Sequence, residues 1–89
     1  ILFKTTASAS FETAGNNKNI SFYIAKNGDF ILRTIQQNFI ATGADTKVIS
    51  LNDVTELSPG DTLQVFTENN TDATNITVDF LNFDITAIN

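Results

Sequence analysis

The sequence predicts an all-β fold, and three features of its composition support this prediction. Ten Ile, eight Phe and thirteen Thr supply β-branched and aromatic side chains, which favour strands. Eleven Asn and four Gly favour the turns between strands. Hydrophobic residues make up 42% of the 89 residues, which is enough for one core, so we expect a single domain spanning residues 1–89.

The first predicted strand covers residues 1–11, where apolar and polar side chains alternate. The small Ala7 and Ala9 indicate a place where another segment packs closely. Because the alternation is already under way at residue 1, we expect the first N-terminal strands of the domain to be missing from this chain. The side chains expected on one face are Ile1, Phe3, Thr5, Ala7, Ala9 and Phe11.

A hairpin is predicted after this strand. Residues 20–25 alternate as a strand, with apolar side chains at the even-numbered positions. Asn27 and Gly28 follow, and this dipeptide tolerates the two positive φ angles of a type I′ turn. The returning strand, residues 30–35, is apolar on both faces, which indicates burial on two sides or contact with a neighbouring chain.

The middle of the chain is less regular. Residues 36–45 are predicted to be irregular, with Phe39 and Ile40 anchoring the segment. A strand follows at residues 46–51, and its pattern fades through Val54.

The last third contains a turn and two strands. Pro59 presets φ and Gly60 supplies the positive φ of a type II turn. The strands after it are residues 62–67 and a long final strand. The apolar phase of the final strand changes near Leu81 and Asn82, which indicates a β-bulge there. Strands at this spacing predict an antiparallel β-sandwich with jelly-roll or Greek-key connections.

The absence of histidine and cysteine excludes most enzyme mechanisms. The chain has no imidazole base, no thiol nucleophile and no disulfide, and it lacks the commonest metal ligands. We therefore expect a protein that is not an enzyme and that needs no cofactor and no metal. Since small domains without cross-links usually gain stability by association, we also expect contacts with other chains.

The charge distribution excludes nucleic acid as a partner. Ten acidic residues against five basic ones give a net charge of −5, and the basic residues are scattered along the chain. Binding to phosphates needs a basic stripe. No apolar run approaches the roughly 20 residues that cross a bilayer, so membrane insertion is not expected either.

Several segments occur in an informative order. An apolar strand ends in Lys26-Asn27-Gly28, the stretch Leu57-x-Pro59-Gly60-Asp61-x-Leu63 enters a later strand, and a long aromatic strand ends the chain. This order resembles the later strands of the tumour-necrosis-factor and complement globular-head superfamily of trimeric jelly rolls. It is most similar to the versions in bacteriophage fibre and capsid-surface proteins. The chain would be the C-terminal two-thirds of such a domain, without the glycine usual in its final strand.

The resemblance implies a homotrimer, in which apolar sheet faces pack around a three-fold axis. The basic residues near the hairpin, Lys26 and Arg33, are then candidates for ion pairs with a neighbouring chain. The residues expected at the trimer interface are Phe3, Ala7, Phe22, Phe30, Leu32, Phe66, Phe80 and Phe83.

The polar loop before the final strand is a candidate ligand site. Its side-chain oxygens suit Ca²⁺ or a sugar, because hard cations prefer several convergent oxygens. A solvated hairpin loop is the alternative, since the loop carries one carboxylate. The residues of this candidate site are Asn69, Asn70, Thr71, Asp72 and Asn75.

Two smaller groups are also candidates for chemistry, each with a structural alternative. Asp53, Glu56 and Asp61 surround one turn, where carboxylates act as an acid–base pair or cap the turn. Tyr23 and Phe39 suit either stacking on a sugar ring or packing in the core or an interface.

The expected function is that of a non-enzymatic virion structural protein, a trimeric jelly-roll module of a phage fibre, spike or capsid decoration. It would act in assembly or host attachment at the virion surface. The expected partners are copies of itself, other virion proteins, and a host cell-surface glycan or receptor. The alternatives are a carbohydrate-binding module of a secreted bacterial protein and an extracellular trimeric recognition head. The absence of Trp and the single Tyr count against sugar binding.

Overall fold

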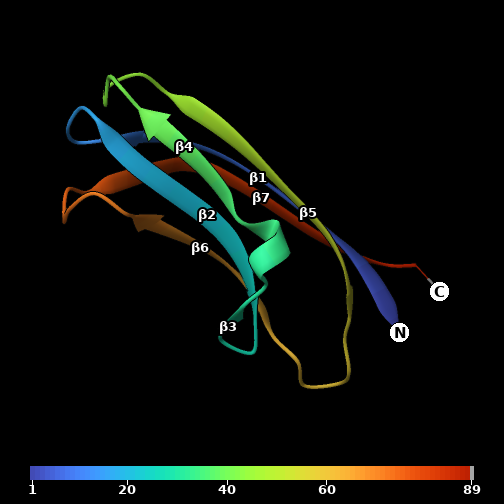
Figure 1. Ribbon diagram of the computed structural model, residues 1–89. Helices are drawn as coiled ribbons and strands as arrows, with labels where there is room; N and C mark the ends of the chain where they lie inside the picture. Colours follow the sequence, from blue (N-terminus) through green and yellow to red (C-terminus); the bar gives the residue numbers. More distant parts are fainter. Residues whose placement is uncertain (89) are drawn as a thin grey trace.

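The computed structural model describes residues 1–88, which form strands and one short 3₁₀ helix (Figure 1). The predicted all-β fold is confirmed. In chain order the elements are β1 (Leu2–Thr13), β2 (Lys18–Lys26), β3 (Asp29–Phe30), the 3₁₀ helix η1 (Leu32–Thr34), β4 (Gln36–Ile40), β5 (Lys47–Glu56), β6 (Leu63–Asn69) and β7 (Ile76–Ala87).

The strands form two antiparallel sheets that lie face to face, as in a β-sandwich (Figure 1). One sheet has the order β5-β1-β7. In the other sheet β2 is central, with β6 on one edge and both β3 and β4 on the opposite edge. The chain therefore crosses between the sheets at β1–β2, β4–β5, β5–β6 and β6–β7.

The core lies between the two sheets and is built on β1. The predicted inward face of this strand is confirmed, since Ala7, Ala9 and Phe11 are buried. The alanines leave room for larger neighbours, because Ala7 pairs with Leu51 on one side and with Phe83 on the other. Across the sandwich, the rings of Phe11 and Phe22 pack with their centroids 4.8 Å apart.

Burial on both faces occurs in β2, where every residue from Ile20 to Ala25 is buried. Burial on two sides was one of the two alternatives for residues 30–35, and it is wrong, since Phe30 and Leu32 are 52% and 74% exposed. The other alternative, contact with a neighbouring chain, stays a prediction. The segment pairs with β2 only at Asp29 and Phe30 and then turns into η1. The Thr34 hydroxyl ends the pairing, because it accepts a hydrogen bond from the Ile24 N–H and donates one to the Ile31 carbonyl.

Residues 36–40 form the strand β4, although they were predicted to be irregular. Most of the side chains of this strand face solvent, so the sequence lacks an apolar alternation. The predicted anchor is half confirmed, since Ile40 is fully buried in the core and Phe39 is 64% exposed.

Both predicted turns are confirmed. Asn27 and Gly28 have φ angles of 52° and 85° and join β2 to β3 as a two-residue hairpin. Gly60 has a φ angle of 92°, and the Asp61 N–H donates to the Ser58 carbonyl across the Pro59-Gly60 turn. Glycine adopts such positive φ angles without strain, and Asn tolerates them better than most residues.

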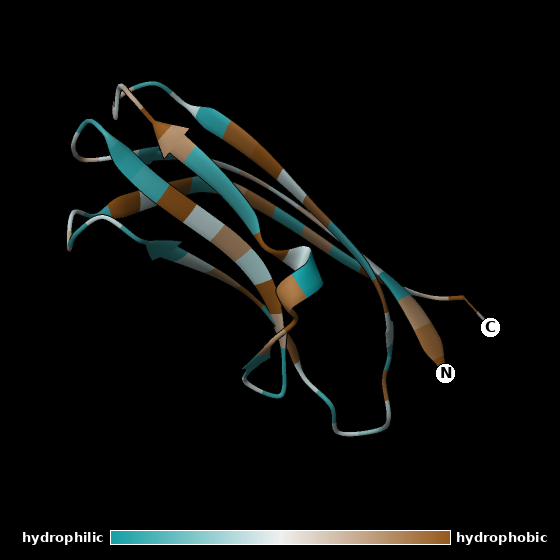
Figure 2. Cartoon of the chain, in the orientation of Figure 1, coloured by the Kyte–Doolittle hydropathy of each residue, from teal (hydrophilic) through white to brown (hydrophobic). Residues whose placement is uncertain are grey.

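The final strand contains a bulge two to three residues earlier than predicted. Phe11 pairs with Val78 while the preceding Ser10 pairs with Phe80, so Asp79 is the extra residue. The bulge changes which residues face inward, because Leu81, Phe83 and Ile85 then lie opposite the inward residues of β1. Figure 2 shows hydrophobic residues along the length of β7.

The two long sides of the sandwich differ. On one side lie β4 and β5, and η1 closes this side through an ion pair between Arg33 and Asp53. On the other side lie β6 and β7, each of which is the edge strand of its sheet (Figure 1).

Candidate functional site

The outward face of the β5-β1-β7 sheet carries two exposed apolar side chains that flank β1. Val48 and Phe80 both pair with Ser10, one from each neighbouring strand, and are 71% and 75% exposed. Between them the surface is hollowed and floored by small residues of β1, including Ser8 and Ser10. We call Val48, Phe80, Ser8 and Ser10 the serine-floored patch. Its low floor allows another surface to approach the backbone of β1 closely.

The outward face of the other sheet carries an aromatic cluster, defined as Tyr23, Phe30 and Phe66. The Tyr23 ring lies 4.2 Å from Phe30 and 5.7 Å from Phe66, centroid to centroid. Tyr23 is buried beneath the other two, which are 52% and 37% exposed. Burial and the negative charge of Glu68 both raise the pKa of the Tyr23 hydroxyl.

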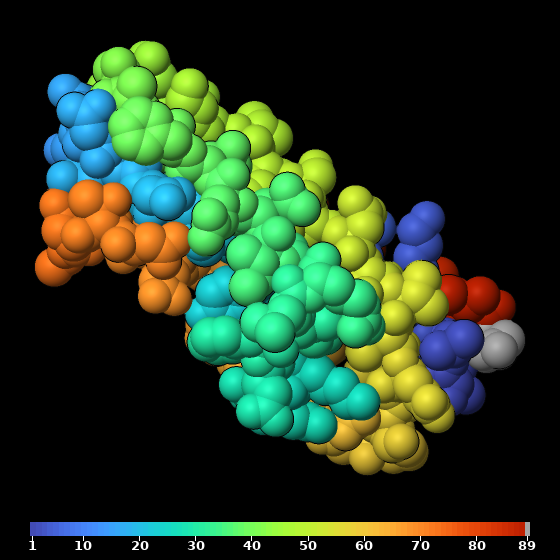
Figure 3. Space-filling model, viewed as in Figure 1, coloured from blue at the N-terminus to red at the C-terminus, as the bar shows by residue number. Residues whose placement is uncertain are grey.

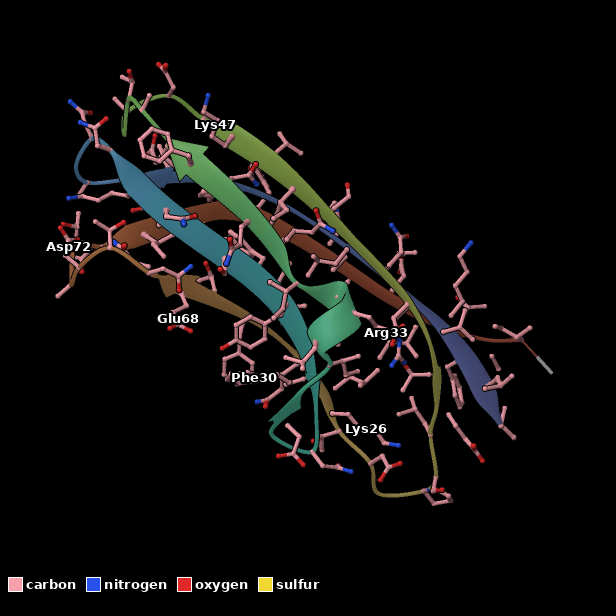
Figure 4. All side chains as sticks on the ribbon, in the orientation of Figure 1. Lys26, Phe30, Arg33, Lys47, Glu68 and Asp72 are labelled. Carbon is pink, nitrogen blue, oxygen red and sulfur yellow. The ribbon has the colours of Figure 1, made fainter. Side chains whose placement is uncertain are left out.

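The aromatic cluster borders a hollow beside the β2–β3 hairpin. Lys26, Asn27 and Asp29 supply polar groups to its lining, while Leu32 and Phe30 supply apolar surface. Figure 3 views the molecule from this side, where the teal and green atoms of the hairpin and η1 stand out from the surface. Figure 4 shows that Phe30 and Glu68 lie on this same face.

The polar loop between β6 and β7 uses its oxygens internally. Asn69 Oδ1 accepts hydrogen bonds from the backbone N–H groups of Thr71 and Asp72. The Asp72 carboxylate binds Lys18 Nζ at 2.6 Å and the Thr74 N–H at 3.0 Å. These hydrogen bonds, that from Lys18 first, hold the pKa of Asp72 well below its usual range.

The other members of the predicted ligand loop are also engaged. Asn70 Nδ2 donates to the Ser21 hydroxyl at 2.6 Å, and the Asn75 carbonyl accepts from the Ala14 N–H at 3.0 Å. The loop is therefore tied to β2 and to the end of β1. A solvated hairpin loop was the structural alternative, and hydrogen bonds within the chain occupy the Asn69, Thr71 and Asp72 side-chain oxygens that a ligand would use.

Two of the three carboxylates around the β5–β6 turn make hydrogen bonds that hold the fold. Asp53 is bound by Arg33, and the Thr55 hydroxyl also donates to it. Asp61 accepts from the Ser58 N–H and from Asn27 Nδ2. Those bonds, that from Ser58 first, lower the pKa of Asp61. Glu56 uses its backbone carbonyl, which accepts from Lys26 Nζ.

Lys26 and Arg33 pair within the chain, and ion pairs of these residues with a neighbouring chain stay a prediction. Lys26 Nζ lies 3.8 Å from Asp61 Oδ2, and Arg33 Nε lies 2.6 Å from Asp53 Oδ1. Figure 4 shows both basic side chains near the lower end of the sandwich. Their partners come from β5 and the turn after it, so these pairs join the two sheets.

The predicted interface residues fall into three sets. Ala7 and Phe22 are buried in the core of the chain itself, so they present no surface to a neighbour. Phe3 and Phe83 are half-buried at the inner side of their sheet. The exposed members are Phe30, Leu32, Phe66 and Phe80.

The described residues contain no cluster that resembles a metal centre. Within residues 1–88, no three acidic side chains lie close enough to hold an ion. Every buried side-chain polar atom in this part of the chain has a hydrogen-bond partner. No helix there has the length and apolar character needed to cross a membrane.

The comparisons with known proteins add no relative. No protein-family model, curated protein or solved structure gives a significant match to this chain. The candidate sites are therefore defined by geometry alone. Of these sites, the serine-floored patch is the one that the sequence predicted only in part. Phe80 was expected at an interface, but Val48 was not. The signal was the apolar Val48 beside Ile49, which places an apolar side chain on each face of β5.

Proposed function

We propose that this chain is a non-enzymatic structural module that assembles as a homotrimer of jelly-roll domains on a virion surface. The observation that carries the assembly proposal is the serine-floored patch on the outward face of the β5-β1-β7 sheet. Phe80 and Val48 are more than two-thirds exposed there. Large exposed apolar groups grouped on one face of a small protein indicate an interaction surface.

The patch suits contact between copies of a chain. Burial of a fully exposed Phe stabilises a complex by about 1.5–3 kcal/mol, and each copy contributes one. The Ser8 and Ser10 floor between Phe80 and Val48 leaves space for a side chain of a neighbouring copy. Association would also compensate for a core that is small and has no cross-links.

The virion location and the jelly-roll connections rest on the resemblance to phage fibre and capsid-surface domains. The β-sandwich with chain crossings between its sheets is compatible with that architecture. The lack of an imidazole or thiol in the sequence supports a structural role over catalysis. The same resemblance assigns assembly or host attachment as the task.

Light scattering coupled to size-exclusion chromatography tests the assembly. The expected mass is three times 9.7 kDa, and it stays constant over a range of dilutions. Phe80→Asp is expected to lower the mass to that of one chain. Phe39→Asp is the matched control, because Phe39 is 64% exposed on the other sheet and its change leaves the trimer intact. A folded wild-type monomer at every concentration would overturn the proposal.

Glycan binding is a second candidate function, favoured by the aromatic cluster. Exposed faces of Phe30 and Phe66 beside the amide of Asn27 provide a surface on which a sugar ring can stack. A glycan array probed with the chain and with Phe30→Ala tests this function. Binding that the substitution abolishes supports it, and an array without signal rejects it.

A further inference from the structure

The side of the sandwich formed by β6 and β7 is open. Each strand is paired on one edge only, β6 with β2 and β7 with β1, within residues 1–88. Figure 1 shows the two strands running along the same side, joined by their loop at one end. The opposite side has no such opening, because η1 and the Arg33–Asp53 ion pair close it.

Inward-facing side chains are exposed on the open side and buried elsewhere. Leu81 pairs with Ala9 and Ile85 pairs with Thr5, so both lie on the core side of their sheet. They are nevertheless 49% and 46% exposed. On the other edge of β1, Ile49 and Asp53 pair with the same Ala9 and Thr5 and are 5% and 9% exposed. Equivalent positions on the two edges of β1 therefore differ strongly in exposure.

Within residues 1–88, the free edge of β7 lacks lysine, proline and a covering segment, which are three of the features that usually prevent a strand from pairing. Protected edges are short, or carry lysine or proline, or are covered by another segment. β7 is 12 residues long and contains neither residue type. Its one irregularity is the bulge at Asp79, so the stretch from Phe80 to Ala87 remains regular.

The charges on the open side determine which kind of partner strand is favoured there. β6 carries Glu68, β7 carries Asp79 and Asp84, and neither strand carries a basic residue. The whole chain also has a net charge of −5, so a second copy would bring further negative charge to this edge. A second copy is therefore disfavoured here, and a basic strand is favoured.

We propose that the free edge of β7 binds an extended segment of another polypeptide, in which apolar residues alternate with Lys or Arg. The segment adds a strand to the β5-β1-β7 sheet by backbone hydrogen bonds. Its apolar side chains cover Leu81 and Ile85, and its basic side chains lie on the outward side near Asp84. This site is separate from the serine-floored patch and goes beyond the proposed trimer.

The first test uses a designed probe and the full chain. The probe is a fluorescein-labelled nine-residue peptide, capped at both ends, in which five Val alternate with four Lys. Fluorescence anisotropy is expected to show saturable binding that weakens as salt is raised. A peptide of the same composition with its Val and Lys in separate blocks, and a Val–Glu alternating peptide, are expected to bind at least tenfold more weakly.

Two charge-reversal variants locate the site. Asp84→Lys is expected to weaken binding of the Val–Lys probe about tenfold. Asp45→Lys is the matched control, because it makes the same charge change in the exposed β4–β5 loop and is expected to leave affinity unchanged. Both positions are exposed, so neither substitution disturbs the core.

Hydrogen exchange of the backbone amides identifies the strand that is bound. Bound probe is expected to slow exchange at β7, and exchange at the β5 edge stays unchanged. Three outcomes would each overturn the proposal. They are equal binding of the alternating and block peptides, protection at β5 in place of β7, and equal effects of the two variants. Displacement of a second copy by the probe would assign the edge to self-association and overturn it as well.

Discussion

Arg33 binds the carboxylate of Asp53 through two hydrogen bonds, from Nε to Oδ1 at 2.6 Å and from Nη2 to Oδ2 at 2.9 Å. The pair connects η1, which follows the β2–β3 hairpin, to β5 of the opposite sheet. The Asp53 side chain is 5% exposed, while that of Arg33 is 64% exposed. The carboxylate is therefore a buried charge whose compensation comes from a surface residue, and loss of the arginine would leave that buried charge unpaired.

Loss of the Asp53 charge is expected to weaken the connection between the sheets. Asp53→Asn should lower the free energy of unfolding by about 1–3 kcal/mol, because it weakens two charge-assisted hydrogen bonds in a half-buried setting. Urea unfolding followed by circular dichroism measures the change. Asp45→Asn, at an exposed position, is the control and should change stability by less than about 0.5 kcal/mol. Equal effects of the two substitutions would contradict the role of the ion pair.

Stability is expected to fall in acid. Burial raises the pKa of Asp53, but hydrogen bonds from Arg33 and Thr55 outweigh burial and hold the pKa below its usual value. The pKa values of Asp61 and Asp72 are lowered as well. The unfolded chain then binds more protons than the folded chain below about pH 4.

The stabilisation by these carboxylates is complete above the unfolded pKa near 4 and is lost as pH falls through the lower folded values. Urea midpoints measured between about pH 2 and 7 should therefore decrease below about pH 4. Asp53→Asn should show a shallower decrease than the wild type. A midpoint that rises on acidification would show that the sign of this linkage is wrong.

The hydrogen bonds of the Thr34 hydroxyl are expected to stabilise the turn from β3 into η1. It is buried, accepts from the Ile24 N–H at 2.9 Å and donates to the Ile31 carbonyl at 2.7 Å. Thr34→Val keeps the shape and leaves a buried N–H without a partner, which should cost about 1–3 kcal/mol. Thermal unfolding compares it with Thr86→Val, an exposed position in β7 where little change is expected. Retained stability in Thr34→Val would refute the argument.

Gly43 is expected to tolerate no side chain. A Cβ there would lie 2.3 Å from the Gly15 carbonyl oxygen and 2.6 Å from that of Thr13. Gly43→Ala should therefore destabilise the chain by about 3 kcal/mol, since backbone atoms must move. Gly28→Ala is the comparison, because its Cβ meets open space and only the positive φ is strained, which costs about 1–2 kcal/mol. A smaller loss at Gly43 than at Gly28 would contradict the close approach.

The sequence predicted the elements whose signals are local. The hairpin at Asn27 and the turn at Gly60 depend on the conformational freedom of single residues, and the inward face of β1 follows from its alternation. The fate of residues 30–35 was not predictable, because the Thr34 hydroxyl competes for backbone groups only after β2 lies beside it. In β4 most side chains are exposed and polar, so the sequence has no apolar alternation there that would predict a strand.

The candidate sites depend on register, which a single sequence does not reveal. Val48 and Phe80 flank the same residue of β1, because each pairs with Ser10. Phe80 pairs with Ser10 because of the bulge at Asp79. The ion pair of Arg33 with Asp53 joins residues 20 positions apart through the path of η1. For the loop between β6 and β7 the alternative was a solvated hairpin loop, and its internal hydrogen bonds were not predicted, although Asn and Thr side chains favour bonds to nearby backbone.

The position of β1 at the centre of its sheet has a consequence for how the chain reaches this fold. Leu2 pairs with Glu56 and Phe3 pairs with Ala87, so β1 pairs with two strands that follow it at a long distance in the sequence. Contacts between such distant positions carry a high loop-closure cost and slow the folding of β proteins. During synthesis, the apolar face of β1 therefore stays partly uncovered until β7 has been made, and only then can this sheet be completed.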